Sequence, residues 1–376
     1  ILADKLAVVT SYTGAADRVE LLNAGLNELN ADSLLLGATR QHQGADVVLD
    51  VQASKVTVES GTALSIPEVM LAARKKSDPD QTGTITVAAG ATITASDGDR
   101  VRAPASIQLT GDSAFARVSS ADQVRVDRAS SPGASGKIDI AAGAVLTASR
   151  SITLDASQDT VVDGDLKKTN DGSLSLSLAA SRVSLGEAPA GTGGLVLSNA
   201  RLGSLEARDL LLNSRSTIDF HGGVSLANLN HVALNAAGLG GHGNADQTAS
   251  ISADTISISN RSNIGFTGTP NGSGKLNLAA REVTLGTTGE NGFAVRGFSD
   301  TTISATGQTV ARPDADTPAK LHVAGDLPLQ ASRLTASAGA DVSIDTQNAA
   351  GVMAGKMTLT APATPASLTS VNDLGA

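Results

Sequence analysis

The sequence lacks cysteine and tryptophan, and its other aromatic residues are five phenylalanines and a single tyrosine, Tyr12. The absence of cysteine excludes disulfides, thiolate metal sites and cysteine nucleophiles. It also suits a secreted protein that crosses a membrane unfolded. Globular enzymes normally use more aromatic side chains in their cores and pockets. A narrow core of stacked aliphatic side chains does not need them, so the composition favours that kind of core.

The sequence also lacks long apolar runs and concentrated positive charge. No stretch approaches the ~20 consecutive apolar residues that span a bilayer, and no leader pattern opens the chain. The net charge is −9, and the one short basic run is at residues 74–76. Without a basic stripe or aromatic stacking platforms, we expect no nucleic-acid binding. The chain begins and ends within its strand pattern, so we expect a fragment of a longer protein.

The sequence does contain a repeated unit. The segments GTITVAAGATITAS at 83–96 and GKIDIAAGAVLTAS at 136–149 are identical at nine of fourteen positions. Each copy reads as a short strand, an Ala-Ala-Gly corner and a second short strand. Because side chains alternate along a strand, we expect Ile138 and Ile140 to point inward and Val145 or Leu146 to begin the next face. Looser copies of the unit lie at 172–186, 274–286, 319–332 and 355–362.

Short strands with an apolar-polar-apolar pattern continue from residue 31 to the end of the chain, separated by polar loops. Strands this short need neighbours above and below them. The pattern predicts an all-β protein built as a parallel β-helix, a solenoid in which each strand pairs with the equivalent strand one coil later. We expect roughly 20 to 25 residues per coil. No linker or shift in composition divides residues 31–376, which we expect to be one domain.

Residues 1–30 differ from this pattern and are predicted to form an N-terminal flank. Apolar residues recur at helical spacing between 17 and 30, at Val19, Leu22, Leu26 and Leu29. The spacing predicts a short helix over 17–30, with Asp17 as its N-cap.

Five histidines are candidate metal ligands: His42, His221, His231, His242 and His322. A coil of about 21 residues, within the solenoid range, would bring His221 and His242 into vertical register. A zinc site is then conceivable, because imidazole is a common zinc ligand. The alternative is that these are scattered surface histidines, and we expect no metal site.

Three Asp-x-Asp pairs offer oxygen ligands of the kind that Ca²⁺ prefers. Asp-Gly sequences are also ordinary turn chemistry, and the turn is the interpretation that we adopt. The pairs are Asp97/Asp99, Asp163/Asp165 and Asp314/Asp316.

The segment GLGGHG at 238–243 fits the spacing of a dinucleotide-binding glycine pattern. That pattern requires a following helix whose N-terminus holds the pyrophosphate. Residues 244–258 instead have a strand pattern, so we expect a loop at 238–243. A calcium-binding glycine repeat is a second alternative, but the segment occurs once and Asp246 lies one place away from the required position.

The segments LNADSLLLGATR at 29–40 and ASKVTVESGTALSIPEVMLAA at 53–73, followed by the repeat at 83–96, resemble the large filamentous-haemagglutinin-type exoproteins of Gram-negative two-partner secretion systems. The resemblance implies a right-handed parallel β-helical shaft that is secreted or held at the cell surface. It also implies a dedicated outer-membrane transporter as the partner during export. The Asn-Pro motifs of the family's secretion domain are missing here.

These observations predict a structural adhesin shaft that mediates attachment, biofilm formation or cell–cell contact through unidentified host-cell, bacterial-surface or matrix ligands. Polysaccharide-acting lyases and hydrolases on β-helices use a cleft with stacked carboxylates and basic side chains. No such cluster recurs in the sequence, so we expect no enzyme and no catalytic, cofactor-binding or metal-binding residues. The alternatives are a β-helical polysaccharide-acting enzyme and a passive stalk that presents a distant toxin or effector domain.

Overall fold

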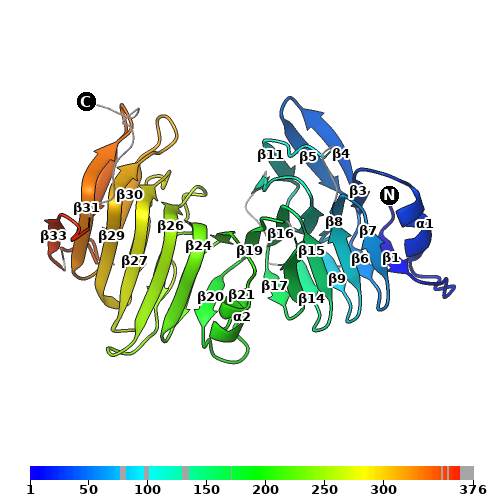
Figure 1. The fold of residues 1–376 in the computed structure, drawn as a ribbon, viewed down its shortest axis with the longest axis horizontal. Helices are drawn as coiled ribbons and strands as arrows, with labels where there is room; N and C mark the ends of the chain where they lie inside the picture. The colour runs from blue at the N-terminus through cyan, green and yellow to red at the C-terminus, as the bar shows by residue number, and fades with distance from the viewer. Residues whose placement is uncertain are drawn as a thin grey trace. The chain divides into compact units, whose positions relative to one another are not determined.

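The computed structural model describes residues 1–76, 82–96, 101–128, 135–170, 172–348, 350–353 and 355–364. In this described part, 33 β-strands and two short α-helices form the structure, which confirms the all-β prediction (Figure 1). The chain divides into two compact units. Unit 1 comprises residues 1–181, 193–195 and 205–208, and unit 2 comprises 182–192, 196–204 and 209–376. The expected boundary at residue 30 and the single domain over 31–376 stay predictions.

Three sheets of unit 1 contain most of its strands. The first sheet has the order β17 (Asp159–Val162), β14 (Lys137–Ile140), β9 (Thr84–Val87), β6 (Lys55–Val58), β1 (Lys5–Val9), β2 (Val19–Leu22). The second has the order β18 (Asp165–Lys168), β15 (Val145–Ala148), β10 (Thr92–Ala95), β7 (Ala63–Ser65). In the third, the unit 1 strands follow the order β3 (Leu34–Leu36), β8 (Glu68–Arg74), β12 (Ser113–Ser119), β16 (Ser151–Ala156), β19 (Ser175–Ala180).

The chain visits these three sheets in a fixed sequence. It passes from β6 to β7 to β8, and then repeats the path through β9, β10 and β12, through β14, β15 and β16, and through β17, β18 and β19. Pairing is parallel throughout the first two sheets. In the third sheet β12 is antiparallel to both β8 and β16. Parallel in-register pairing is therefore the rule in these three sheets of unit 1, and β12 is a local exception to it.

The two closest copies of the repeat lie directly on each other. Ile85 pairs with Ile138 in the first sheet, and Ile93 pairs with Leu146 in the second. All four side chains are buried, so identical or similar aliphatic residues form a continuous row inside the unit. This confirms the predicted inward direction of Ile138 and the start of the next face at Leu146. Burial of such side chains stabilises the fold by roughly 1.5 to 3 kcal/mol each.

The repeat also keeps its glycines for steric reasons. At Gly136 a Cβ atom would lie 2.2 Å from the carbonyl oxygen of Ser113, and at Gly83 it would lie 2.6 Å from the Cα atom of Arg74. The corner glycines, Gly90 and Gly143, have φ angles of 76° and 84°, which other residues adopt at a cost. The corners also stack, because the amide of Gly90 donates to the carbonyl of Gly143 at 3.0 Å.

A fourth sheet in unit 1 explains why β8 and β12 are buried on both faces. It has the order β13 (Arg125–Arg128), β11 (Ser106–Leu109), β5 (Asp46–Val51), β4 (Ala38–Gln43). Figure 1 shows β4, β5 and β11 beside one another, next to β8. Leu49 and Leu109 of this sheet share a second apolar core with Met70 of β8 and Phe115 of β12. The outer face of β8 and β12 is therefore an interior layer.

In unit 2 the chain mostly alternates between two sheets, and one exception is β26, which is followed directly by β27 of the same sheet. One contains β22 (Asp209–Ser214), β24 (Val224–Asn235), β26 (Thr248–Ser259), β27 (Gly274–Leu285), β29 (Phe298–Ala311), β31 (Leu327–Ala336), β33 (Met357–Thr360). The other contains β20 (Val183–Gly186), β23 (Thr217–His221), β25 (Gly238–Gly241), β28 (Phe293–Arg296), β30 (Ala319–Val323), β32 (Val342–Asp345). Every pair given for these strands is parallel.

Side-chain hydrogen bonds between consecutive layers of unit 2 give the length of its repeat. They join Asn213 to Asn235, 22 residues apart, His231 to Thr255, 24 apart, and Ser304 to Gln330, 26 apart. Two of these spacings fall within the expected 20 to 25 residues, and the third is slightly longer.

The predicted helix over 17–30 is wrong in its extent. Residues 19–22 form β2, which pairs with β1, and the helix α1 is confined to Asn23–Glu28. Asp17 lies in the turn before β2, and Leu22 occupies the N-cap position without a side-chain cap. Strand pairing with β1 therefore overrides the helical spacing. A second helix, α2 (Asn199–Gly203), follows β21 (Leu195–Leu197) and was not expected; the hydroxyl of Ser198 caps it.

Leu278 tests the inward rows of unit 2. It is fully buried in β27, and its register partners are Ile251 and Ile303. We expect Leu278→Asp to lower the free energy of unfolding by about 4 kcal/mol or more, because a carboxylate enters the apolar row. Urea unfolding followed by circular dichroism measures the change. The matched control is Asn277→Asp, because the side chain of Asn277, next to Leu278 in β27, points outward. Equal unfolding midpoints for the two variants would show that Leu278 does not face the core.

Candidate functional site

The five histidines have different surroundings. His42 is exposed on β4. His231 is half-buried, with Nδ1 at 2.7 Å from the hydroxyl of Thr255. His322 lies 3.0 Å from the carboxylate of Asp345. His221 and His242, by contrast, lie together, so the vertical register predicted for them from a coil of about 21 residues, within the solenoid range, is confirmed.

The two histidine rings stack on each other in unit 2. Their centroids are 4.8 Å apart and their planes differ by 7°. The spacing equals the distance between neighbouring strands in a sheet, because His221 ends β23 and His242 follows β25 at the equivalent position. The amide of His242 donates to the carbonyl of Phe220 at 2.8 Å, which continues the parallel ladder up to the histidines.

Asp219 completes this group, and it was not expected from the sequence. It lies two residues before His221 on β23 and therefore on the same face of the strand. One donor atom each from Asp219, His221 and His242 lie within 4.8 Å of one another. Arg182 approaches the other side of the carboxylate, with Nε 3.5 Å from Oδ2. Burial, together with the neighbouring His242, lowers the pKa of His221, so its ring is neutral at neutral pH.

The two described Asp pairs have different surroundings. At Asp163 the backbone amide donates to the carbonyl of Ile140 at 2.9 Å, immediately before β18 begins at Asp165. Asp316 has a φ of 60°, and the amide of Thr317 closes a turn onto the carbonyl of Asp314 at 3.2 Å. The turn interpretation is confirmed for Asp314/Asp316, whereas Asp163 lies in the short connection between β17 and β18 and Asp165 is the first residue of β18. The pair Asp97/Asp99 lies outside the described residues.

The glycine-rich segment at 238–243 is a strand in its first four residues, not a loop. Gly238–Gly241 form β25, between β23 and β28. The glycines are needed because a Cβ at Gly238 would lie 1.9 Å from the carbonyl oxygen of Ala294, and one at Gly241 would lie 2.2 Å from that of Gly297. Close packing of the backbone therefore explains a pattern that otherwise indicates a phosphate-binding turn. The next element is strand β26, as expected.

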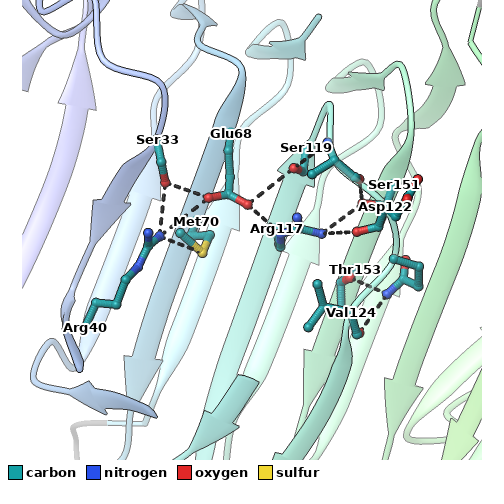
Figure 2. Close-up of polar contacts among 12 residues, drawn as sticks. Ser33, Arg40, Glu68, Met70, Arg117, Ser119, Asp122, Val124, Ser151 and Thr153 are labelled. Carbon is teal, nitrogen blue, oxygen red and sulfur yellow. Dashed lines mark hydrogen bonds and ion pairs between the residues drawn. The ribbon is translucent and has the colours of Figure 1, made fainter. Parts of the chain in front are cut away.

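A buried ion pair forms the second polar cluster, in unit 1. Arg117 of β12 is fully buried, and Glu68 of β8 is nearly so. Figure 2 shows Glu68 between two groups of donors. Its Oε1 accepts from Nε of Arg117 at 2.8 Å and from the hydroxyl of Ser119 at 3.3 Å. Its Oε2 accepts from the hydroxyl of Ser33 at 2.6 Å and lies 3.5 Å from Nη2 of Arg40.

Arg117 extends this network to the next strand (Figure 2). Its Nη1 donates to the carbonyl of Asp122 at 3.1 Å and to the hydroxyl of Ser151 at 2.9 Å. Ser151 in turn donates to the carbonyl of Ala121 at 2.8 Å. The cluster therefore ties β8, β12, β16 and the loop after β12 together at the place where β12 runs against its neighbours.

The charges of this cluster are matched to each other. Burial acts to raise the pKa of Glu68, but Arg117 and the hydroxyl of Ser33 outweigh it and hold that pKa below its usual value. Burial lowers the pKa of Arg117, and Glu68 opposes this effect. The pair is therefore ionised at neutral pH. Both carboxylate oxygens of Glu68 and the Nε and Nη1 atoms of Arg117 have partners on neighbouring strands, and Nη2 of Arg117 is buried without one. The geometry favours a clamp that fixes strand register.

The sequence analysis missed Glu68 and Arg117. The available signal was clearer for Arg117, the single charge in the strand SAFARVS, than for Glu68, which begins the strand EVMLAAR that also ends in Arg74. A charge at such a position is stable only with a buried partner.

The apolar cavity in unit 2 belongs to the core. It is lined by aliphatic side chains and Thr309 from neighbouring strands. Neither of the two helices in the described residues is long and apolar enough to cross a membrane.

Comparison with known proteins finds no match for this chain among protein-family models, curated proteins or solved structures.

The Glu68–Arg117 pair makes a quantitative prediction. Removing one partner, in Glu68→Leu or Arg117→Met, leaves the other charge buried and should cost about 3 to 5 kcal/mol of unfolding free energy. The double variant Glu68→Leu/Arg117→Met should lose much less than the sum. Urea unfolding of the four proteins measures the coupling. Arg125→Met is the control, because its ion pair with Asp127 is exposed and contributes about 0 to 1 kcal/mol. Additive losses would contradict a coupled clamp.

Proposed function

We propose that each unit is built as a right-handed parallel β-helix, and that the chain is part of a rigid extracellular shaft. The fixed path through three sheets in unit 1 supports this proposal, because each passage adds one layer to the same three faces. In unit 2 the alternation between two sheets, with an exception at β26 and β27, supports it in the same way. A right-handed crossover is the usual hand for parallel strands connected in this way.

The observation that carries the functional proposal is the kind of residue that recurs on the outside. Asn213, Asn235 and Ser259 occupy successive layers and are joined by side-chain hydrogen bonds of 2.8 and 3.1 Å. Such rows stabilise the stack and keep its surface hydrated. No acid, base or aromatic platform repeats along them in the described strands. A surface of this kind suits attachment through many weak contacts, whose combined strength exceeds that of each contact.

We infer a secreted or cell-surface protein of the filamentous-haemagglutinin type, and the sequence resemblance is the support for this inference. Its partners would be an outer-membrane transporter during export and surface ligands of cells or matrix afterwards. The role is structural, in adhesion, biofilm formation or cell–cell contact. The core of aliphatic rows, together with an aromatic content of 2%, agrees with a stiff scaffold better than with a substrate pocket.

Display on a non-adherent bacterium tests this function. We expect cells that display the chain to aggregate and to attach to immobilised matrix more than cells that carry the display anchor alone, because multivalent weak contacts add. Cells displaying Leu278→Asp should lose this gain, whereas Asn277→Asp should keep it. Attachment equal to that of the anchor alone would contradict an adhesive role.

A parallel assay addresses the enzymatic alternative. The purified chain is incubated with plant and bacterial polysaccharides, and new reducing ends and unsaturated products are measured. The proposal predicts neither product, and release of either one would replace the structural role by a catalytic one.

A further inference from the structure

The group of Asp219, His221 and His242 has the composition of a transition-metal site. In the part of the chain that the structure describes, it is the one set of three or more His, Cys, Asp or Glu residues whose donor atoms converge. Two imidazoles and one carboxylate are typical ligands of zinc and related ions. The residues come from β23 and from the end of β25, two paired strands of unit 2. The site therefore rests on rigid elements.

Strand register creates the space for the carboxylate. Asp219 is paired with Gly240, and a Cβ atom at Gly240 would lie 2.5 Å from Oδ1 of Asp219. The missing side chain at Gly240 thus leaves room for the carboxylate between the strands. The same register places His242 on His221. Gly240 therefore lies opposite Asp219, and His242 lies opposite His221 of the preceding layer.

The ring nitrogens of His242 and His221 have surroundings that suit metal binding. Nδ1 of His242 lies 3.2 Å from Oδ1 of Asn271, so that Nδ1 carries the proton and Nε2 has a free lone pair. Nε2 lies 3.9 Å from Oδ1 of Asp219. A hydrogen-bonded partner of this kind usually orients a ligating histidine. In His221, Nε2 is shielded from solvent and has no hydrogen-bond partner, which is costly for a buried polar atom.

The three donor atoms need to move only slightly closer together to bind one zinc ion. Zinc lies about 2.0 to 2.2 Å from its nitrogen and oxygen ligands, so tetrahedral ligands are roughly 3.4 Å apart. The donor atoms of the group lie within 4.8 Å of one another, and one pair is already at 3.9 Å. Tilting the two stacked rings towards each other about their χ2 torsions closes the difference. Three protein ligands then leave one position for water.

The positive charge of Arg182, beside Asp219, opposes the binding of a cation at this site. Its Nε lies 3.5 Å from Oδ2 of Asp219, and its side chain is 44% exposed. The guanidinium competes with a cation for the carboxylate, and its long side chain can move into solvent when an ion binds. Its removal therefore has a predictable sign: affinity for a cation should increase.

We propose that Asp219, His221 and His242 bind one divalent transition-metal ion of the zinc class, with Asn271 as the residue that orients His242. The site is independent of the adhesive role, since it depends only on the pairing of β23 with β25 and on the side chains around them.

Calorimetric titration of the purified chain with zinc chloride tests the proposal, and cobalt chloride adds a visible absorption band that reports the coordination. We expect one saturable site. His221→Ala, His242→Ala and Asp219→Asn should each weaken binding by at least about tenfold, and Asn271→Ala by about 10- to 100-fold. Arg182→Met should tighten binding. His42→Ala and His322→Ala are matched controls that should leave the affinity unchanged.

Circular dichroism establishes that each variant is folded. Arg182→Met removes an exposed side chain, so it keeps the test decisive if a ligand variant unfolds. Absence of saturable binding in the wild-type chain would overturn the proposal. So would binding that survives the combined His221→Ala/His242→Ala change, or binding that Arg182→Met leaves unaltered. Loss of binding in His42→Ala or His322→Ala would show that the metal binds elsewhere, and would also overturn the proposal.

Discussion

In-register stacking of aliphatic side chains is the constraint on which the rest of the structure depends. Short strands do not persist alone, and here each strand is held by an equivalent strand in the neighbouring layer. Aliphatic rows such as Ile85 on Ile138 and Ile251 on Leu278 form most of the core, and a few buried phenylalanines such as Phe220 add to it. A shift by one residue would turn every apolar side chain outward, so the register of one layer fixes that of the next.

The same constraint builds the two polar clusters. In unit 2, parallel register places His242 on His221 and Gly240 opposite Asp219, so three donors converge without a specialised loop. In unit 1, the rule is interrupted where β12 runs antiparallel to its neighbours. The Glu68–Arg117 pair lies at this interruption, and Arg40 of the fourth sheet approaches Glu68 to 3.5 Å. We interpret it as the element that makes the reversed strand specific, since a misplaced β12 would leave both charges buried without partners.

Much of the fold was predictable because it is local and repeated. Alternating patterns and the Ala-Ala-Gly corners identified many strands and their inward side chains, whereas the spacing between layers varies more than expected, as for Ile85 and Ile138. The helix over 17–30 was predicted too long because pairing of β2 with β1 is a distant contact that outweighs helical spacing. The strand at Gly238–Gly241 was missed for a related reason: its glycines serve close approach to Ala294 and Gly297. The register of His221 and His242 followed from their spacing, whereas Asp219, Glu68 and Arg117 acquire their partners only through long-range pairing.

Disulfide formation between introduced cysteines tests in-register stacking most directly, since the chain has no cysteine of its own. Ser250 and Asn277 are register partners on the outer face of β26 and β27, and Lys275 lies two residues before Asn277. Partner positions meet the Cα separation that a disulfide requires, whereas the diagonal pair is roughly 8 Å apart and does not. Mild oxidation should therefore cross-link Ser250→Cys/Asn277→Cys efficiently and leave Ser250→Cys/Lys275→Cys reduced. Equal cross-linking of both pairs, or preference for the diagonal pair, would contradict the stacked register.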